Sequence, residues 1–383
     1  MKVTFDRKQL INAVTPLLGC VSNKNTFAAI AGILVSTDME SGNCILSAYD
    51  LEKGMRTVLP CRVEEDGAYV LNANKFAQVI RSMEEDSVTV TVDPKTNQTT
   101  VVSGAAFFVF GAQNGEEFPI LPSLTGDRGI RVKRNEFRDI VNKTSFAIAV
   151  NDARASLNGA YFHVENNKFT VVGCDGNRLS RVIYDLDVEY TLDTVHFDQE
   201  FIIPGKTMNE LLTVIDDSEE YLEMQLTYKH VFFKFDNTDF FSRLIDQPYV
   251  EYQRFIPKNN KIFAFINTAA MNGAVSRALL VTEDKVSGQS KSPVRLKFSE
   301  DILTVSSSSV VSRISDDIPV RKEGEDIEIG FNCRLLLDAL RVCDAEELKL
   351  SLNSPYMSML IEPAEETPGR EFLMLVLPVR LNN

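Results

Sequence analysis

The sequence lacks the patterns that mark membrane proteins, disulfide-rich proteins and metalloproteins. None of its apolar runs approaches the ~18 residues that a membrane-spanning helix needs. Its first residues enter an amphipathic pattern without an apolar signal region. Its 6 cysteines are scattered without a C-x-x-C pair, and its 3 histidines stand alone. We therefore expect a cytoplasmic protein with reduced, mostly buried thiols and with no bound metal or other cofactor.

Motifs of the common enzyme classes are missing as well. No G-x-G-x-x-G, H-E-x-x-H, G-x-S-x-G or alternating acidic calcium loop occurs in the chain. Gly205-Lys206-Thr207 resembles the end of a phosphate-binding loop, but Glu200 stands where that loop needs its first glycine, and Pro204 precedes the tripeptide. We therefore expect Lys206 to begin a helix. A pair of acids acting as general acid and base stays open, although no pair is singled out.

Positive charge is scarce relative to negative charge. The 383 residues include 40 Lys and Arg against 54 Asp and Glu, which gives a net charge of −14. Taken alone, this balance argues against a protein that coats nucleic acid electrostatically. Hydrophobic residues make up 44% and charged residues 25% of the chain, as in ordinary globular proteins. The length predicts two to three domains.

Apolar stripes with helical spacing recur along the chain at nearly constant intervals. A stripe at i, i+3, i+4 and i+7 predicts an amphipathic helix with one buried face. Two sets of three such stripes occur, one being Leu10/Ala13/Val14/Leu17, Phe137/Ile140/Val141/Thr144 and Met271/Ala274/Val275/Ala278, the other Phe76/Val79/Ile80/Met83, Met208/Leu211/Leu212/Ile215 and Leu336/Ala339/Leu340/Cys343. Asp6 and Thr268 are the expected N-caps of two of these helices.

Between the helices the sequence alternates as strands do, with turn signals that include Asp93-Pro94, Asn166-Asn167, Asp236-Asn237 and Ser287-Gly288. So few helices among so many strands predict antiparallel sheets backed by two helices, an α+β arrangement. We therefore expect three related domains over residues 1–125, 126–257 and 258–383. A three-fold scaffold without shared chemistry stays open at this point.

One turn distinguishes the second repeat. Cys174-Asp175-Gly176-Asn177-Arg178-Leu179 carries an Asp-Gly turn between two strand-like segments, which is typical of a hairpin. The corresponding turns are Ala48–Glu52 in the first repeat and Ser306–Ser309 in the third, and neither places an arginine after a glycine. This asymmetry indicates that one repeat is specialised.

With these residues in view, the whole chain resembles the bacterial replicative sliding clamp, the β subunit of DNA polymerase III. Four stretches carry the resemblance in order: Leu157-Asn158-Gly159, Cys174–Leu179, Phe241–Asp246 continuing to Tyr252–Pro257, and Leu377–Leu381. The resemblance implies a non-enzymatic homodimer whose two head-to-tail chains form a six-domain ring around duplex DNA. Helices packed ~10 Å apart give a circle of ~60 Å circumference, or ~19 Å diameter, for the six helices of one chain. The twelve helices of two chains give ~120 Å, or ~38 Å diameter. Because a duplex is roughly 20 Å wide, only two chains can surround it.

A closed ring holds DNA mechanically, so the resemblance is compatible with the acidic net charge. Weak, exchangeable phosphate contacts are then sufficient. The resemblance places loop contacts to DNA at Lys24, Asn151 and Arg154, and the inward helices offer as lining candidates Lys8, Lys133, Arg138, Lys206 and Arg277. For each of these cations, an ordinary solvated charge is the alternative.

The resemblance also implies a peptide pocket between the second and third domains. Its partners are short peptides of the polymerase III catalytic subunit, the clamp loader, other DNA polymerases and repair proteins. Carried over by position, the pocket consists of Leu157, Cys174, Gly176, Asn177, Arg178, Leu179, Val250, Arg254, Phe255, Leu375, Leu377 and Pro378. The apolar members would hold a Leu or Phe anchor, and Asn177, Arg178 and Arg254 would orient a peptide backbone or a glutamine. Asn177 replaces a frequent histidine, and Val250 stands where proline is common.

The ring joint is expected to bury Phe108 and Phe110 of the first domain against Leu280 of the third domain of the other chain. If these side chains belonged to the core instead, dimerisation would rest on other residues. Two further classes compete with the clamp: a hydrolase or transferase built on scattered acids, and a scaffold that binds no DNA. A monomer with metal-dependent turnover would favour the first, and failure to support processive synthesis would favour the second.

Overall fold

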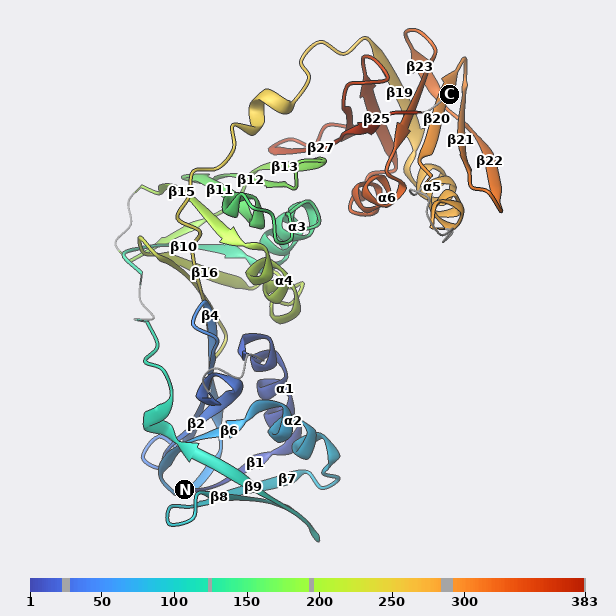
Figure 1. The fold of residues 1–383 in the computed structure, drawn as a ribbon. Coiled ribbons are helices and arrows are strands. Elements are labelled where there is room, and N and C mark those ends of the chain that lie inside the picture. Colours follow the sequence, from blue (N-terminus) through green and yellow to red (C-terminus); the bar gives the residue numbers. More distant parts are fainter. Residues whose placement is uncertain (23–27, 123–125, 193–195, 284–291, 382–383) are drawn as a thin grey trace. The chain divides into compact units, whose positions relative to one another are not determined.

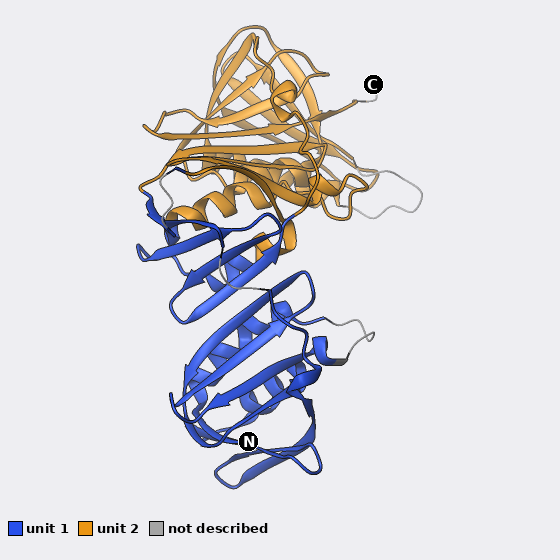
Figure 2. Cartoon of the chain, turned by 90° about the vertical axis from the view of Figure 1, so that its left-hand side faces the viewer, with its two compact units in different colours: residues 1–135, 188–196, 210–244 blue, residues 136–187, 197–209, 245–383 orange. Residues whose placement is uncertain are grey.

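The computed structural model describes residues 1–22, 28–122, 126–192, 196–283 and 292–381 (Figure 1). These residues form two compact units: unit 1 comprises residues 1–135, 188–196 and 210–244, and unit 2 comprises residues 136–187, 197–209 and 245–383 (Figure 2). Within the described residues, no helix is long and apolar enough to cross a membrane.

The chain repeats one element order three times. Each repeat runs strand, helix, five strands, helix and three strands, which gives β1–β9 with α1 and α2, β10–β18 with α3 and α4, and β19–β27 with α5 and α6. The antiparallel pairings repeat too, since β3–β4, β12–β13 and β21–β22 are equivalent, as are β8–β9, β17–β18 and β26–β27. The expected α+β fold of three clamp-type domains is therefore confirmed. We refer to the three repeats as the first, second and third domains.

Unit 1 is organised by one 14-stranded sheet in the order β14-β10-β16-β17-β18-β4-β3-β2-β6-β9-β8-β7-β1-β5. Its first-domain strands are β1 (Lys2–Asp6), β2 (Gly32–Asp38), β3 (Asn43–Tyr49), β4 (Lys53–Pro60), β5 (Arg62–Glu65), β6 (Gly67–Asn72), β7 (Ser87–Asp93), β8 (Gln98–Ser103) and β9 (Ala106–Asn114). Its second-domain strands are β10 (Arg128–Lys133), β14 (Glu189–Thr191), β16 (Tyr221–Leu226), β17 (His230–Phe235) and β18 (Thr238–Arg243). The sheet thus continues from one domain into the next.

Unit 2 contains a 9-stranded sheet, β15-β11-β12-β13-β27-β26-β25-β19-β23, and a 5-stranded sheet, β22-β21-β20-β24-β28. The first consists of β11 (Gly159–Glu165), β12 (Lys168–Cys174), β13 (Arg178–Asp185), β15 (Asp198–Pro204), β19 (Ile262–Asn267), β23 (Arg321–Glu323), β25 (Glu347–Leu352), β26 (Met359–Pro363) and β27 (Arg370–Val376). The second consists of β20 (Val294–Ser299), β21 (Ile302–Ser308), β22 (Arg313–Pro319), β24 (Ile327–Phe331) and β28 (Pro378–Val379).

The helices follow the apolar stripes of the sequence. They are α1 (Arg7–Leu17), α2 (Ala73–Ser82), α3 (Arg134–Ser145), α4 (Gly205–Val214), α5 (Thr268–Thr282) and α6 (Cys333–Arg341), with short 3₁₀ turns at Leu18–Cys20, Ala28–Ala31, Gly115–Glu117, Ala155–Asn158 and Tyr252–Phe255. Every stripe residue is buried except Leu212, which is half-buried. Burial of one helix face against the sheets is the main source of helix stability here, because isolated helices of this length are marginal in water.

Two N-caps test the capping predictions. The Asp6 carboxylate accepts the Gln9 backbone N–H at 2.9 Å, as expected. The predicted N-cap of α5, Thr268, was wrong by one residue, because Asn267 accepts the hydrogen bond from the Ala270 N–H at 3.0 Å. Both residue types satisfy an unpaired helix donor, so sequence alone did not fix which residue precedes the first turn. Lys206 lies in the first turn of α4, as predicted, rather than in a phosphate loop.

Three hairpin turns occupy equivalent positions in the domains. Asp50 accepts backbone N–H groups two and three residues on, at 3.0 and 2.8 Å. Asp175 does the same at 2.8 and 3.0 Å, and the Ser309 hydroxyl does so at 3.2 and 3.0 Å. The predicted Asp-Gly hairpin is therefore confirmed, with Gly176 at φ +87°, where a side chain would be strained. The predicted turn at Ser287-Gly288 lies outside the described residues.

Candidate functional site

Adjacent domains are joined by the same pair of strands in both units. In unit 1, β4 of the first domain pairs antiparallel with β18 of the second. In unit 2, the equivalent strand β13 pairs with β27 of the third domain. We call these the first and second joints. Because the third domain repeats the plan, β22 is the remaining strand of the β4 and β13 type, and β9 is the remaining strand of the β18 and β27 type.

Each joint also contains one ion pair between the end of the hairpin turn and the second helix of the following domain. At the first joint, Lys53 Nζ lies 2.9 Å from Glu210 Oε1 on α4, with side chains 8% and 28% exposed. At the second, Arg178 Nη1 lies 2.8 Å from Asp338 Oδ2 on α6, with side chains 11% and 29% exposed. We call this ion pair the strap. Its recurrence in two domains shows that it belongs to the joint.

The second joint contains a cavity of about 320 Å³. Ten of the twelve residues predicted for the peptide pocket line it, together with Arg154: Leu157, Cys174, Gly176, Asn177, Arg178, Leu179, Val250, Phe255, Leu375 and Leu377. Arg254 and Pro378 are not among the lining residues. Arg254 is solvent-exposed and ion-paired with Glu251, and Pro378 begins β28, opposite Phe331.

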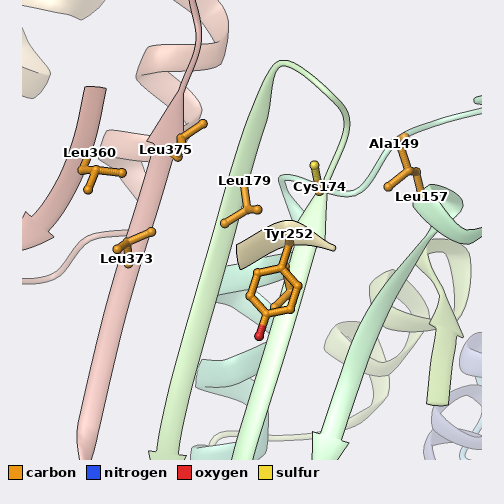
Figure 3. Close-up of a cluster of buried hydrophobic side chains, with 9 residues drawn as sticks. Ala149, Leu157, Cys174, Leu179, Tyr252, Leu360, Leu373 and Leu375 are labelled. Atoms are coloured by element: carbon orange, nitrogen blue, oxygen red, sulfur yellow. The ribbon is translucent and has the colours of Figure 1, made fainter. Parts of the chain in front are cut away.

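A buried apolar cluster forms the base of this cavity. Leu179 and Cys174 lie on neighbouring strands beside Leu375 and Leu373 of the third domain, and Tyr252, from a 3₁₀ turn, lies in front of the strands of Leu179 and Cys174 (Figure 3). Burial raises the pKa of the Cys174 thiol, so it stays protonated and behaves as a small apolar group. The lining therefore offers an apolar socket with polar groups at its rim.

Arg178 is held by several contacts within the joint, which the sequence did not indicate. Its Nε lies 3.0 Å from Asp175 Oδ2 and its Nη1 binds Asp338, while its guanidinium stacks 5.2 Å from the Phe146 ring. The backbone N–H of Leu377 donates to the Asn177 carbonyl at 2.8 Å and continues the joint beyond the strands. Sequence reasoning missed Asp338 as a partner, because it follows Arg178 by 160 positions and carries no motif.

The residues expected to touch DNA differ in their exposure and in their local contacts. Lys24 lies outside the described residues. Asn151 is exposed at φ +58° on the loop before the second domain's first hairpin. Arg154, on the same loop, is paired with Asp152 at 3.0 Å, and its hydrogen bonds hold the pKa of that carboxyl at about 2. Lys206 is exposed in the first turn of α4.

The other lining candidates are equally varied. Lys8 is exposed on α1, whereas Lys133 and Arg138 are half-buried at the end of β10 and on α3. Arg277 on α5 pairs with Asp316 of β22, its Nε 2.8 Å from the carboxylate, so its charge is locally balanced. In the residues that the structure describes, no three His, Cys, Asp or Glu side chains gather as a metal site would require.

The residues predicted for the ring joint are accessible rather than core. Phe108 is exposed and Phe110 half-buried on β9, and Leu280 on α5 is 74% exposed. Phe107 and Val109, which the sequence analysis did not single out, are also exposed on the same strand. The part of β9 from Ala106 to Gly111 pairs with β8 but leaves its other edge unpaired within the described residues, and so does β22 on the side away from β21.

Three domains of one repeated plan, continued edge to edge through shared sheets, define a clamp-type architecture. Comparison with known proteins agrees over nearly the full length. Models of the N-terminal, central and C-terminal domains of the DNA polymerase III β subunit match residues 1–122, 131–251 and 253–380. The chain therefore belongs to the DNA polymerase III β-subunit family.

Curated relatives and solved structures fit this assignment. The beta sliding clamp of Halalkalibacterium halodurans is 27% identical and that of Bacillus subtilis 28% identical, each alignment covering 99% of this chain and 100% of the relative. The crystal structure of the DNA polymerase sliding clamp from Bacillus subtilis is 25% identical, covers 100% of both chains and gives a TM-score of 0.91.

Proposed function

We propose that the protein is a sliding clamp, a processivity factor for DNA replication that encircles duplex DNA as a homodimer. The repeated joint is the observation that carries this proposal. Two of the three domains use a strand of the β4 type to bind the following domain, and the third domain has the same strand, β22, with an open edge. The first domain has the matching open strand, β9. A second copy satisfies both edges head to tail.

This third joint closes a six-domain ring from two chains. Unpaired strand edges favour pairing with another chain unless they are protected, and a heterologous contact that closes after two copies forms a ring rather than a filament. Phe108, Phe110 and Leu280 would lie near this joint, together with Phe107 and Val109. Burial of these apolar side chains would contribute to dimer stability.

DNA is held in such a ring by enclosure, so a strong positive field is unnecessary. Exposed Lys206 and Asn151 support weak phosphate contacts, and Lys24 belongs to the same proposal. Arg154 is shared between the loop and the cavity of the second joint. Contacts of this kind carry no base information and exchange readily, which sliding requires.

The cavity at the second joint would capture partner peptides. Its apolar base, formed by Leu179, Leu375 and their neighbours, suits a Leu or Phe anchor. The expected partners are the polymerase III catalytic subunit, the clamp loader, other DNA polymerases and repair proteins. On this proposal the protein performs no catalysis of its own, acts in the cytoplasm where the chromosome lies, and has domain boundaries near residues 125 and 257.

Retention on circular DNA tests the proposal directly. The dimer, loaded onto a nicked circular plasmid by a clamp loader, should stay bound through a gel-filtration column at salt concentrations that screen phosphate contacts. Cutting the plasmid once should release it. Release from the intact circle at the same salt, or retention on the linear product, would contradict enclosure. The mass of the free protein in solution, expected to be that of two chains, is the companion measurement.

A further inference from the structure

Three directly opposed residues at each joint occupy the place where the cavity lies at the second joint. In unit 2 they are Cys174 on β12, Leu179 on β13 and Leu375 on β27, because Cys174 pairs with Leu179 and Leu179 pairs with Leu375. Directly opposed residues in a sheet present their side chains on the same face. We call such a set of three the cross-strand row. All three members of this row line the cavity.

The equivalent row at the first joint is Tyr49 on β3, Gly54 on β4 and Phe241 on β18, by the same pairings. A Cβ atom on Gly54 would lie 2.4 Å from the Phe241 Cζ atom, so the phenyl ring occupies the space that the Leu179 side chain takes at the second joint. Phe241 is 0% exposed, and its ring centroid lies 5.4 Å from that of Tyr49. The Tyr49 hydroxyl donates to the Leu51 carbonyl at 3.3 Å, which fixes the second ring over the turn.

The row at the third joint has a different chemistry again. Ser308 on β21 pairs with Arg313 on β22. The third member of this row would come from β9 of a second copy. When the β8–β9 hairpin is aligned with the β17–β18 hairpin, Val109 takes the position of Phe241, and hence of Leu375. Arg313 and Ser308 are both exposed in the single chain. A guanidinium at the centre of the row would put a charge where the socket needs apolar surface, and burying it without a partner is costly.

From these rows we infer that the cross-strand row decides which joint captures peptides. The strand framework of the socket recurs at the three joints of the proposed ring. The protein's own Phe241 and Tyr49 rings fill the first row, Arg313 makes the third row polar, and the Cys-Leu-Leu row lines an apolar cavity. The first joint therefore carries a latent socket that is closed by an internal plug. This inference rests on the proposed peptide-binding function and explains why one chain would bind one peptide.

Exchanging the rows tests this inference. The probe is the synthetic peptide Gln-Leu-Ala-Leu-Phe, chosen for its apolar Leu and Phe side chains and its glutamine, and it is titrated calorimetrically into the full-length protein. The wild type should bind one peptide per chain. The variant Tyr49→Cys with Gly54→Leu and Phe241→Leu should bind two, and adding Leu375→Phe should return the stoichiometry to one by filling the original socket. Phe240→Leu is the matched control, because Phe240 is equally buried on the same strand but faces the opposite side.

The reverse exchange and a milder variant keep the test decisive. Leu375→Phe in the wild-type background should weaken the peptide at least tenfold while the melting temperature and the dimer persist. If the triple variant does not fold, Phe241→Leu alone opens the plug without overpacking Gly54, and a second, weaker site is expected. A folded Phe241→Leu or triple variant that still binds one peptide per chain would overturn the inference. A wild type that binds no peptide would instead contradict the proposed function.

Discussion

Installing a strap at the third joint should tighten the dimer. The repeat places Ser312 where Lys53 and Arg178 stand in the other domains. The backbone N–H of Ser309 donates to the Ser312 carbonyl, just as the N–H groups of Asp50 and Asp175 donate to the carbonyls of Lys53 and Arg178. The repeat also places Gln78 of α2 where the acids of the other two straps stand on α4 and α6. The third joint therefore lacks both charges. The variant Ser312→Arg with Gln78→Glu supplies them.

The size of the effect follows from the exposure of the existing straps. The cations of these straps are nearly buried and their acids are about a quarter exposed. The stabilisation from each strap should therefore lie between that of a surface ion pair, ~0.2–1 kcal/mol, and that of a charged hydrogen bond, ~1.5–3 kcal/mol. A new pair in this setting should contribute about 1 kcal/mol. A dimeric ring has two third joints, so the dissociation free energy should rise by about 2 kcal/mol, or roughly 30-fold in Kd.

The measurement is the dimer dissociation constant from sedimentation at two salt concentrations. The double variant should show the gain at low salt and lose part of it at high salt. Each single substitution should leave Kd within a few-fold, and the variant with Ser312→Arg and Gln78→Lys should weaken the dimer by like-charge repulsion. A double variant no tighter than the sum of its singles would refute the placement of these residues at one joint. A wild type that stays monomeric would refute the joint itself.

Three smaller predictions follow from the second joint and from the thiols. Asp338→Asn weakens the strap and leaves Arg178 to Asp175 alone, so chemical denaturation should show a loss of about 1–3 kcal/mol; no loss would contradict a structural role for the pair. Leu377→Ala should weaken peptide binding about tenfold without lowering the melting temperature, since this lining side chain is partly exposed; an unchanged affinity would contradict the pocket. A hydrogen bond from the neighbouring thiol lowers the pKa of Cys61, whereas burial raises that of Cys174. Because thiolates react, peptide mapping after iodoacetamide at neutral pH should find Cys61 modified first, with Cys174 following only as pH rises.

Local chemistry made the helices and turns predictable. The stripes located the six α-helices of the described residues, because a buried face must repeat every 3.6 residues, whatever surrounds it. The Asp-Gly hairpin followed from turn chemistry alone, and Asp50 and Asp175 bind the backbone as short polar side chains do in turns. Ten pocket positions were predicted from a resemblance rather than from physics, and these ten residues line one cavity of the structure.

The sequence did not reveal which residues pair across long separations along the chain. Arg178 stood out in the sequence, yet its binding to Asp338 depends on a strand joint that brings residues 160 positions apart together. Gly54 gave no signal either, because its role appears only when Phe241 lies against it. In both cases the decisive partner belongs to the neighbouring domain. A repeat read one domain at a time cannot reveal it.

The three joints share one plan but have diverged in the features that matter for a ring. The first and second joints are covalently continuous through the chain, and each adds a strap, so neither is a favourable place for opening. The proposed third joint has no strap and no covalent continuity, and its strand pairing must be remade each time the ring closes. An enclosing ring must open to admit DNA, and the opening should occur where the least free energy is lost. On the proposed function, divergence of Ser312 and Gln78 from the charged residues at the other joints would concentrate opening at the interface between chains. The cross-strand rows would confine the proposed peptide capture to the second joint.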